Sequence, residues 1–348
     1  MTAMPGIEFF SAAEVRELLG FDVAIDALET ALRDGLSPED DGPRLFADAP
    51  NGEFLLMPAQ SATFSGVKAL TIAPQNPERG LEKIQGLYLL YSSDTLAPIA
   101  VLEGSCLTAI RTPAVTLTAI RHLARLAPEG ARLGSNPRVL VFGAGTQAIE
   151  HVRAALVDFP DASFGVVGRR PERVAAMIEA LGADPATAHV PVTAVGDGAN
   201  TDAWPGSVDG AGSGDGAGSV DEAVAAADII ILTTTSTTPV LDGRLVGANA
   251  IVAATGTHGL DAREVDDELV RRADVAVEGR GSGRRENGNL ASAYDDAAWE
   301  SSPPANLQDL VRGNFTRTLG RPAFYTGVGM SWEDLVCASA VYSARTRP

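Results

Sequence analysis

The segment VLVFGAGTQAIEHV, residues 139–152, constrains the fold of this chain more than any other. In it an apolar run leads into the pattern G-x-G-x-x-A, and a helix-period segment follows. The first glycine allows a tight turn, the second lets the backbone approach a pyrophosphate, and the small third residue lets the helix pack closely on the strand. The helix N-terminus then favours the anion. The motif predicts a dinucleotide-binding loop made of Gly143, Ala144, Gly145, Thr146, Gln147 and Ala148.

From residue 138 onward the chain alternates apolar runs with helix-period segments. The runs PRVLVFG, SFGVVG, ADIIILTTT, NAIVAAT and ADVAVEG are short and continuously apolar, as in strands buried on both faces. Segments such as EHVRAALVDF and PERVAAMIEALG separate them. This alternation predicts an α/β fold with a Rossmann-type, doubly wound parallel sheet. From about Gly320 we expect the chain to leave this sheet through a loop and a last amphipathic helix.

The end of the second apolar run indicates which dinucleotide binds. A site for NAD usually has an acidic residue there, which accepts hydrogen bonds from the ribose hydroxyls. Here GVVGRRPE carries Arg169 and Arg170 and no acid before Glu172. Two guanidinium groups suit a 2′-phosphate. We therefore expect NADP or NAD, with NADP favoured; the alternative is that both arginines lie on the surface beside the coenzyme without binding it.

The N-terminal part is expected to mix helices with strands. SAAEVRELLG predicts a helix with Ser11 as its N-cap and Glu14 completing a capping box. GVKALTIAP and GLYLLYSSDTLAPIAVLEG predict strands, the second pair joined by a hairpin turn near Ser93. A long helix is expected over residues 105–126. In the later part, the Gly-, Asp- and Ser-rich segment 196–222 predicts a flexible surface loop without chemistry.

Composition limits the partners. The chain has 45 acidic and 27 basic residues, a net charge of −18, and its basic residues include only two lysines, Lys68 and Lys83. An acidic surface almost without lysine is typical of extreme halophiles, in which dense charge keeps proteins in solution at screening salt; a merely acidic mesophilic protein is the alternative. Nucleic acid is not expected, because binding it needs a basic face.

Apolar runs, the N-terminus and the cysteines indicate the cellular compartment of the protein. No apolar run approaches the about 20 residues of a membrane helix. The N-terminus has no basic region followed by an apolar stretch, as a signal peptide would have. Only Cys106 and Cys337 are present, without a CxxC pair. We therefore expect a cytoplasmic protein with no membrane partner, no disulfide framework and no metal site.

Eight motifs, in order along the chain, resemble the ornithine cyclodeaminase/mu-crystallin family. They are FLLMPA (54–59), GVK (66–68), NPERGLEKIQG (76–86), LTAIRTPAV (107–115), GAGTQA (143–148), TTSTTPVLDG (234–243), AREVD (262–266) and GVGMSWEDL (327–335). The resemblance implies a Rossmann domain over residues 119–319. It also implies an α+β substrate-binding and dimerisation domain, built from residues 1–118 and 320–348. In the family two such domains pair in a homodimer with a shared β-barrel.

The family chemistry moves a hydride between the nicotinamide and the α-carbon of an amino or imino acid. Arg44, Lys68 and Arg111 match the family's cationic positions on the substrate side. A guanidinium such as that of Arg111 fits a carboxylate as a fork. Lys68 could bind the carboxylate or, if partly desolvated, exchange a proton with the imine nitrogen. Alternatively, each could be a structural cation in a salt bridge.

Further residues are expected around these groups. Met57 and Gln85 are candidate walls of the substrate pocket. Additional cofactor contacts are expected beside Arg111 and at the ends of later strands, from Thr112, Thr234, Ser236 and Gly256.

His258 departs from the family pattern. The cyclodeaminase motif has an aspartate there, the proposed general base for the substrate amine, and a lysine four residues later; this chain has His258 and Ala262. A neutral imidazole pairs less well with a distal ammonium, although it moves protons near neutral pH. His258 is thus a candidate catalytic residue, with Asp261 as a candidate to orient it or to replace the missing carboxylate. The alternative is a strand-end histidine without chemistry.

These observations predict an NAD(P)-dependent oxidoreductase acting on the α C–N bond of a small amino or imino acid. It would resemble the alanine dehydrogenases or ketimine reductases, with an imino or 2-oxo acid as the other substrate. The first alternative is an ornithine cyclodeaminase, which makes L-proline and ammonia with NAD as a catalytic cofactor. The second is a non-catalytic dinucleotide-binding protein. Arg44, Lys68 and Arg111 argue against the latter, and the His258/Ala262 pair separates the first two.

Overall fold

The computed structural model describes residues 6–196 and 219–346. Two compact units make up the chain: Met1–Val115 with Gly329–Pro348 form the first unit, and Thr116–Val328 form the second. The long helix α3, Gly104–Arg125, is continuous across the division at Val115. The domain limits expected after residues 118 and 319 remain predictions.

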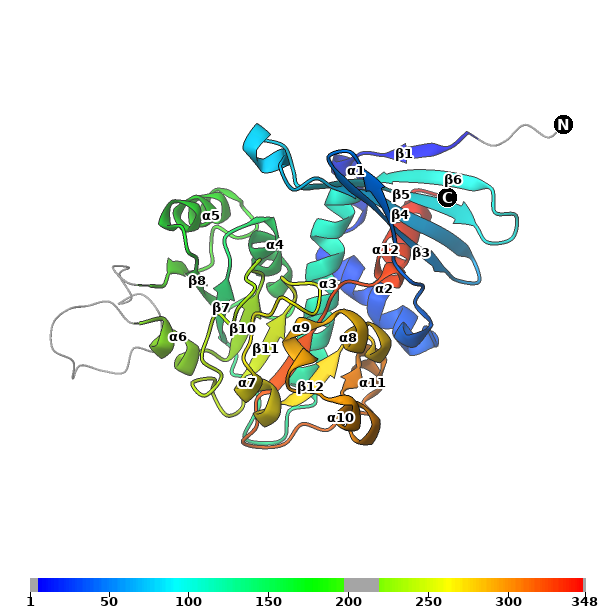
Figure 1. The fold of residues 1–348 in the computed structure, drawn as a ribbon. Helices are drawn as coiled ribbons and strands as arrows, with labels where there is room; N and C mark the ends of the chain where they lie inside the picture. The colour runs from blue at the N-terminus through cyan, green and yellow to red at the C-terminus, as the bar shows by residue number, and fades with distance from the viewer. Residues whose placement is uncertain (1–5, 197–218, 347–348) are drawn as a thin grey trace. The chain divides into compact units, whose positions relative to one another are not determined.

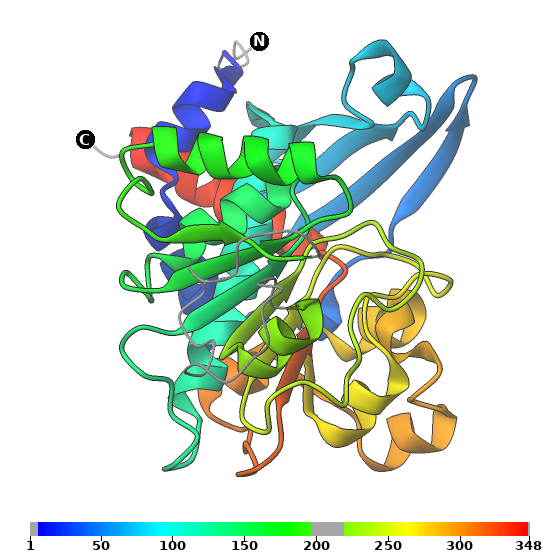
Figure 2. The ribbon, with the colours of Figure 1, turned by 90° about the vertical axis from the view of Figure 1, so that its left-hand side faces the viewer.

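An eight-stranded, all-parallel sheet organises the second unit, and helices lie on both of its faces (Figures 1 and 2). Its strand order is β13-β12-β14-β11-β10-β7-β8-β9. The bounds are β7 Arg138–Phe142, β8 Ser163–Val167, β9 Val192–Ala194, β10 Ile229–Leu232, β11 Ile251–Ala254, β12 Asp274–Val277, β13 Ala305–Asn306 and β14 Ala323–Thr326. All four residues of β10 and of β11 are buried, as continuously apolar strands require. The predicted doubly wound α/β fold is confirmed.

The expected exit of the chain from this sheet near Gly320 is wrong. Ala323–Thr326 form β14, which pairs with β11 on one side and β12 on the other. The run AFYT is short and ends in a polar residue, so its sequence resembles a loop; pairing on both sides makes it a central strand. The sequence also does not predict β13 and β9, because strands of two and three residues are too short to form a recognisable apolar run.

The helices of the second unit follow their strands in sequence. They are α4 Thr146–Ala155, α5 Pro171–Ala183, α6 Val220–Ala226, α7 Asp267–Arg272, α8 Arg280–Glu286, α9 Gly288–Ala291, α10 Asp296–Ser301 and α11 Leu307–Arg312. Helix α6 corrects part of the predicted loop at 196–222, since residues 220–222 are helical. A capping box between Ser219 and Glu222 starts it. Residues 197–218 lie outside the described chain.

The first unit has a six-stranded sheet in the order β1-β6-β5-β4-β3-β2. Only β1 and β6 pair in parallel; the other neighbours are antiparallel. Its elements are β1 Glu8–Phe10, α1 Ala12–Leu18, α2 Phe21–Asp34, η1 Pro38–Asp40, β2 Leu45–Ala49, β3 Gly52–Gln60, β4 Phe64–Ile72, η2 Asn76–Arg79, β5 Ile84–Ser92, β6 Pro98–Glu103 and α12 Ser331–Thr346. The Ser11–Glu14 capping box and the β5–β6 hairpin are confirmed.

One face of this sheet is buried, and helix α12 packs against β3, β4 and β5. Cross-strand register puts Met57, Lys68, Tyr88 and Leu102 in one row on the buried face. Because side chains alternate along a strand, their neighbours point to the opposite face. A lysine in this row is therefore held among apolar side chains by the register of three strand pairs.

Candidate substrate and dinucleotide sites

Four charged side chains meet in the interior of the first unit. Lys68 on β4 places Nζ 3.1 Å from Oδ1 of Asp334. Arg111 on α3 places Nε 3.2 Å from the same oxygen and Nη1 2.6 Å from Oε2 of Glu333. The two cations have side-chain exposures of 3% and 7%, and both carboxylates are fully buried. We call these four residues the charge cluster.

The turn into α12 fixes the acidic half of the cluster. The Asp41 carboxylate accepts hydrogen bonds from the backbone N–H groups of Ser331 and Trp332, at 3.1 and 3.0 Å. Gly329 has φ +75°, and a Cβ there would lie 2.8 Å from Nη1 of Arg111. Arg44 donates from Nη2 to the Gly329 carbonyl at 2.5 Å. A glycine is needed at 329 because the backbone passes against a guanidinium in a conformation that other residues rarely adopt.

Burial controls the electrostatics of Lys68. Desolvation lowers the pKa of Lys68 to about 8, although the Asp334 carboxylate opposes that shift. The ion pair therefore does not compensate for the burial of this ammonium group. A lysine with such a pKa exchanges protons near neutral pH, as catalytic lysines do. Shifts of this kind, caused by desolvation beside specific charges, are typical of functional sites.

The structure brings together most of the predicted substrate residues. Lys68 and Arg111 share Asp334, and Arg44 is tied to Arg111 through Gly329. Met57 is the direct cross-strand partner of Lys68 and is 2% exposed. Gln85 is not part of this group: it is exposed, and strand alternation puts it on the face of the sheet opposite Lys68.

Glu333 and Asp334 were missed as site residues, although both lie in the motif GVGMSWEDL. Two acids in the first turn of a helix are expected there for their interaction with the helix dipole, usually in solvent. Here both are buried against cations that come from β4 and α3. The available signal was their position at the start of a helix that is otherwise largely apolar.

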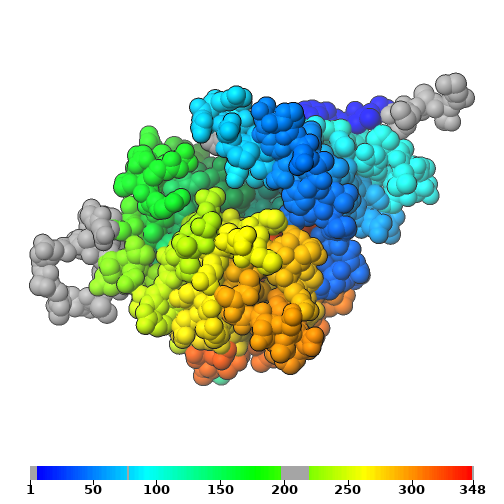
Figure 3. Space-filling model, viewed as in Figure 1, coloured from blue at the N-terminus to red at the C-terminus, as the bar shows by residue number. Residues whose placement is uncertain are grey.

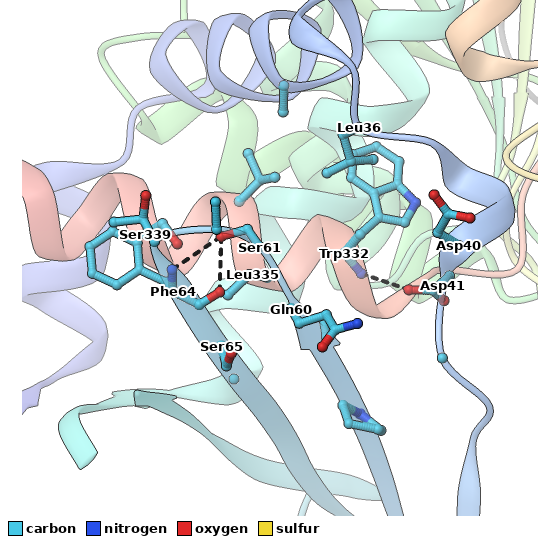
Figure 4. Close-up of a pocket in the computed structure, with 18 of the residues that line it drawn as sticks. Leu36, Asp40, Asp41, Gln60, Ser61, Phe64, Ser65, Trp332, Leu335 and Ser339 are labelled. Carbon is cyan, nitrogen blue, oxygen red and sulfur yellow. Dashed lines mark hydrogen bonds between the residues drawn. The ribbon is translucent and has the colours of Figure 1, made fainter. Parts of the chain in front are cut away.

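A separate groove of about 1390 Å³ runs along α12 in the first unit. Trp332 and Leu335 from α12, Leu36 and Phe64 line it, with Asp41 at one end (Figure 4). None of the four residues of the charge cluster is among the described residues that line it.

In the second unit, the predicted dinucleotide loop has the expected geometry. Gly143 has φ +121°, and a Cβ there would lie 2.5 Å from Oγ1 of Thr233. Gly145 is the N-cap of α4 and provides no side-chain cap. A Cβ at Gly145 would meet no heavy atom of the described residues within 4 Å. Ala148 is fully buried, so the helix lies close to the sheet. Open space above uncapped helix N–H groups fits a pyrophosphate.

The rest of the loop and the end of β8 agree with this fit. Within the described chain, the buried Gln147 Oε1 has no hydrogen-bond partner, while Ala144 is half-buried and Thr146 exposed. Arg169 and Arg170 follow β8, and both are exposed. Neither guanidinium forms a hydrogen bond or ion pair with another described residue.

The predicted residues after β10 and β11 surround a buried carboxylate. Thr234 donates to Oε1 of Glu264 from its N–H at 2.6 Å and from Oγ1 at 2.8 Å. Gly256 donates to Oε2 at 2.8 Å. Ser236 lies two residues beyond Thr234, which accepts a hydrogen bond from its N–H. Thr112 belongs to the first unit, whereas the other predicted cofactor residues belong to the second.

His258 lies in the loop after β11, and 44% of its side chain is exposed. Its Nε2 is 3.2 Å from Oε2 of Glu286, at the end of α8. The carboxylate next to the ring is therefore Glu286 and not Asp261, which is exposed. Glu286 is 28 residues away along the chain, and no sequence signal links the two.

Two kinds of feature are absent from the described residues. In residues 6–196 and 219–346, no three or more His, Cys, Asp and Glu side chains gather as they would around a metal ion. Over those same ranges, no helix has the length and apolar character needed to span a membrane.

Comparisons with known proteins agree with the motifs. The model of the ornithine cyclodeaminase/mu-crystallin family matches residues 8–201 and 215–347. The Δ1-pyrroline-2-carboxylate reductase 2 of Burkholderia ambifaria is 31% identical over 98% of this chain and 97% of its own. The ketimine reductase mu-crystallin of Rattus norvegicus is 28% identical over 97% and 96%.

Solved structures share the fold. One is the Thermococcus litoralis Δ1-pyrroline-2-carboxylate reductase in complex with NADH and L-proline, with a TM-score of 0.77, 24% identity and coverage of 97% of each chain. An archaeal alanine dehydrogenase dimer with bound NAD has a TM-score of 0.76 and 21% identity, over 97% of this chain and 95% of its own. The predicted family is confirmed: the chain belongs to the ornithine cyclodeaminase/mu-crystallin family.

Proposed function

We propose that this protein is an NAD(P)-dependent oxidoreductase that reduces the C=N bond of a small imino acid. The observation that carries the proposal is that Lys68, whose pKa is about 8, and Arg111 are buried beside the same carboxylate, that of Asp334. The relatives named above include two imine reductases that match this chain over nearly its whole length. An imino acid such as Δ1-pyrroline-2-carboxylate offers both groups that the cluster can serve, a carboxylate and a basic nitrogen.

When bound, the reduced nicotinamide supplies a hydride to the α-carbon. Arg111, supported by Arg44, would attract the substrate carboxylate, which would compete with Glu333 and Asp334 for the donors of the guanidinium group. Lys68 Nζ, protonated below about pH 8, would donate a proton to the imine nitrogen and so make the carbon more electrophilic. Asp334 would hold Lys68 and Arg111 side by side. One proton and one hydride added to the imine give the amine.

We further propose that NADP is preferred over NAD. The support is the pair Arg169 and Arg170, exposed at the end of β8 with no described partner. A 2′-phosphate would pair with these guanidinium groups, and no acid occupies the ribose position. The related structures contain NADH or NAD, so the preference needs its own test.

The coenzyme test replaces both arginines, in the variant Arg169→Ala/Arg170→Ala. Loss of two phosphate partners should raise the KM for NADPH about tenfold or more and change the KM for NADH less than twofold. Arg173→Ala, on the first turns of α5, is the matched control. Equal changes for both coenzymes would show that the arginines do not read the 2′-phosphate.

A homodimer is the proposed assembly. The outer face of the first unit's sheet carries the cross-strand row Pro58, Val67, Leu89, Val101 and Phe9, all apolar. The strands β2 and β3 lie open to view in Figure 3, in the blue part of the chain. Phe9, Leu45, Phe54 and Leu87 on this face are 57%, 52%, 46% and 42% exposed. An apolar face of this extent is typical of a surface covered by another subunit.

We also propose that the protein works in the cytoplasm at high salt. Cys106 and Cys337 are both buried and form no disulfide among the described residues, as suits a reducing compartment. The net charge of −18 and the near absence of lysine support a halophilic origin.

The function is tested by following absorbance at 340 nm in molar KCl, with NADPH or NADH and Δ1-pyrroline-2-carboxylate. We expect coenzyme oxidation and L-proline in equal amounts. A parallel reaction holds L-ornithine and catalytic NAD. Proline and ammonia formed there, without net change of coenzyme, would instead identify a cyclodeaminase. No reaction in either, with coenzyme bound, would identify a non-catalytic dinucleotide-binding protein.

A further inference from the structure

The loops after β10 and β11 lie next to each other at the carboxyl edge of the parallel sheet (Figure 1). Strand β7, which leads into Gly143, has β8 on one side and β10 on the other. In doubly wound sheets a dinucleotide crosses the edge at such a switch in strand order. The adenylate half then lies over the β7–β8 side, where Arg169 and Arg170 are, and the nicotinamide half over β10 and β11.

The two loops touch backbone to backbone. A Cβ at Gly256 would lie 2.3 Å from the N atom and 2.3 Å from the O atom of Thr234. No side chain fits there, so residue 256 is glycine because the loops are in direct contact. The ladder between these segments ends with the hydrogen bond from the Thr255 N–H to the Leu232 carbonyl, at 3.0 Å, so beyond it the two loop backbones need another connection.

Glu264 supplies that connection. Oε1 accepts from the N–H and hydroxyl of Thr234, and Oε2 accepts from the N–H of Gly256. Glu264 is fully buried, and its backbone N–H donates to Oδ1 of Asn289 at 2.7 Å. One buried anion thus binds both loops, each through a backbone donor that has a fixed direction.

Glu264 is in turn connected to the sheet by hydrogen bonds. Asn289 donates from Nδ2 to Oγ1 of Thr326, the last residue of β14, at 3.1 Å. Asn287 donates to the same hydroxyl at 3.0 Å. Glu264 is therefore connected through Asn289 to the end of a third strand, and such networks hold their members rigidly when every partner is present.

We propose that Glu264 is a positioning residue for the nicotinamide half of the dinucleotide, an inference that rests on the proposed function. Its carboxylate fixes the loop of Thr234 against the loop of residues 256–258, which contains His258. Burial raises the pKa of Glu264, and its hydrogen bonds to Thr234 and Gly256 favour the charged form. Glutamine in its place would present an N–H₂ group to donors and lose acceptor capacity for at least one loop.

The test compares Glu264→Gln with Asp274→Asn. Asp274 accepts from the backbone N–H and the hydroxyl of one threonine, Thr318, as Glu264 does from Thr234, but it lies at the start of β12, the opposite edge of the sheet. Calorimetry would measure Kd for NADPH and for adenosine 2′,5′-bisphosphate, which lacks the nicotinamide half. For Glu264→Gln we expect Kd for NADPH to rise at least tenfold and Kd for the bisphosphate to change less than twofold. Asp274→Asn should change neither.

Equal NADPH affinity in Glu264→Gln and the parent protein would overturn the inference, as would equal weakening of both ligands. If Glu264→Gln does not fold, Glu264→Asp keeps the charge and shortens the reach. This variant should raise the Kd for NADPH more than the Kd for the bisphosphate. An unchanged ratio of the two Kd values would overturn the inference. Failure of the parent protein to bind either ligand would overturn the proposed preference for NADP; failure to bind NADH as well would overturn the proposed function and this inference with it.

Discussion

At the scale of single residues, Lys68 is the most informative position in the molecule. It is one of two lysines in a chain with 27 basic residues, and it is buried beside the Asp334 carboxylate. Arginine would be a permanent cation. A lysine can instead lose and regain a proton, which its pKa of about 8 allows.

The pH dependence of kcat/KM tests this role. In the proposed reduction Lys68 would donate its proton, so the active form would be the protonated one, present below pH 8 and lost as the pH rises through about 8. We expect kcat/KM to fall above that pH. Lys68→Arg should keep substrate binding, lower kcat about 100-fold or more, and remove this alkaline limb. A limb that persists in Lys68→Arg would assign the titration to another group.

Asp334 offers a second measurement on the same group. Its carboxylate raises the pKa of Lys68 against the effect of burial. Asp334→Asn should therefore move the alkaline limb of kcat/KM to lower pH. An unmoved limb would show that Asp334 does not control the protonation of Lys68.

At the scale of elements, the start of α12 connects folding to the site. The Asp41 carboxylate accepts hydrogen bonds from the first two N–H groups of this helix, and Figure 4 shows the one from Trp332. The next two residues of the helix are Glu333 and Asp334. The same turn therefore both caps the helix and aims the acidic half of the charge cluster.

Asp41→Ala should cost about 1 kcal/mol of the free energy of unfolding, as the loss of a cap usually does, and should also raise the KM for the imino acid. Ser11→Ala removes the N-cap of α1 in the same unit and is the matched control. It should lower stability similarly with the KM unchanged. Denaturant unfolding and steady-state kinetics measure the two effects. If the KM for the imino acid is the same in both variants, the hydrogen bonds of Asp41 to α12 do not influence the substrate site.

Sequence reasoning succeeded where structure is set locally. The turn at Gly143, the strands of unbroken apolar residues and the Ser11 capping box each depend on neighbours within a few positions. It failed where distant segments decide the outcome. β14 is a strand because β11 and β12 pair with it on both sides. Gln85 lies on the face opposite Lys68 because of the register of β5. Glu286 contacts His258 although the two are 28 residues apart in the chain.

At the scale of the whole molecule, the apolar outer face of the first unit's sheet predicts the assembly. Phe54→Glu/Leu87→Glu puts two charges on it and should give a monomer by light scattering, because burying unpaired charge at an interface is costly. Val157→Glu changes another exposed apolar residue, 38% exposed, in the second unit and should remain a dimer. A dimeric Phe54→Glu/Leu87→Glu variant would place the interface elsewhere.

The fate of the hydride tests the proposed reduction most directly. Reduction of Δ1-pyrroline-2-carboxylate would be run with NADPH deuterated at C4 on one face, then on the other, and the proline examined by mass spectrometry and NMR. We expect one deuterium at the α-carbon of proline from one of the two coenzymes and none from the other. Proline without deuterium from either coenzyme, or no proline from a protein that binds NADPH, would contradict the proposed reduction.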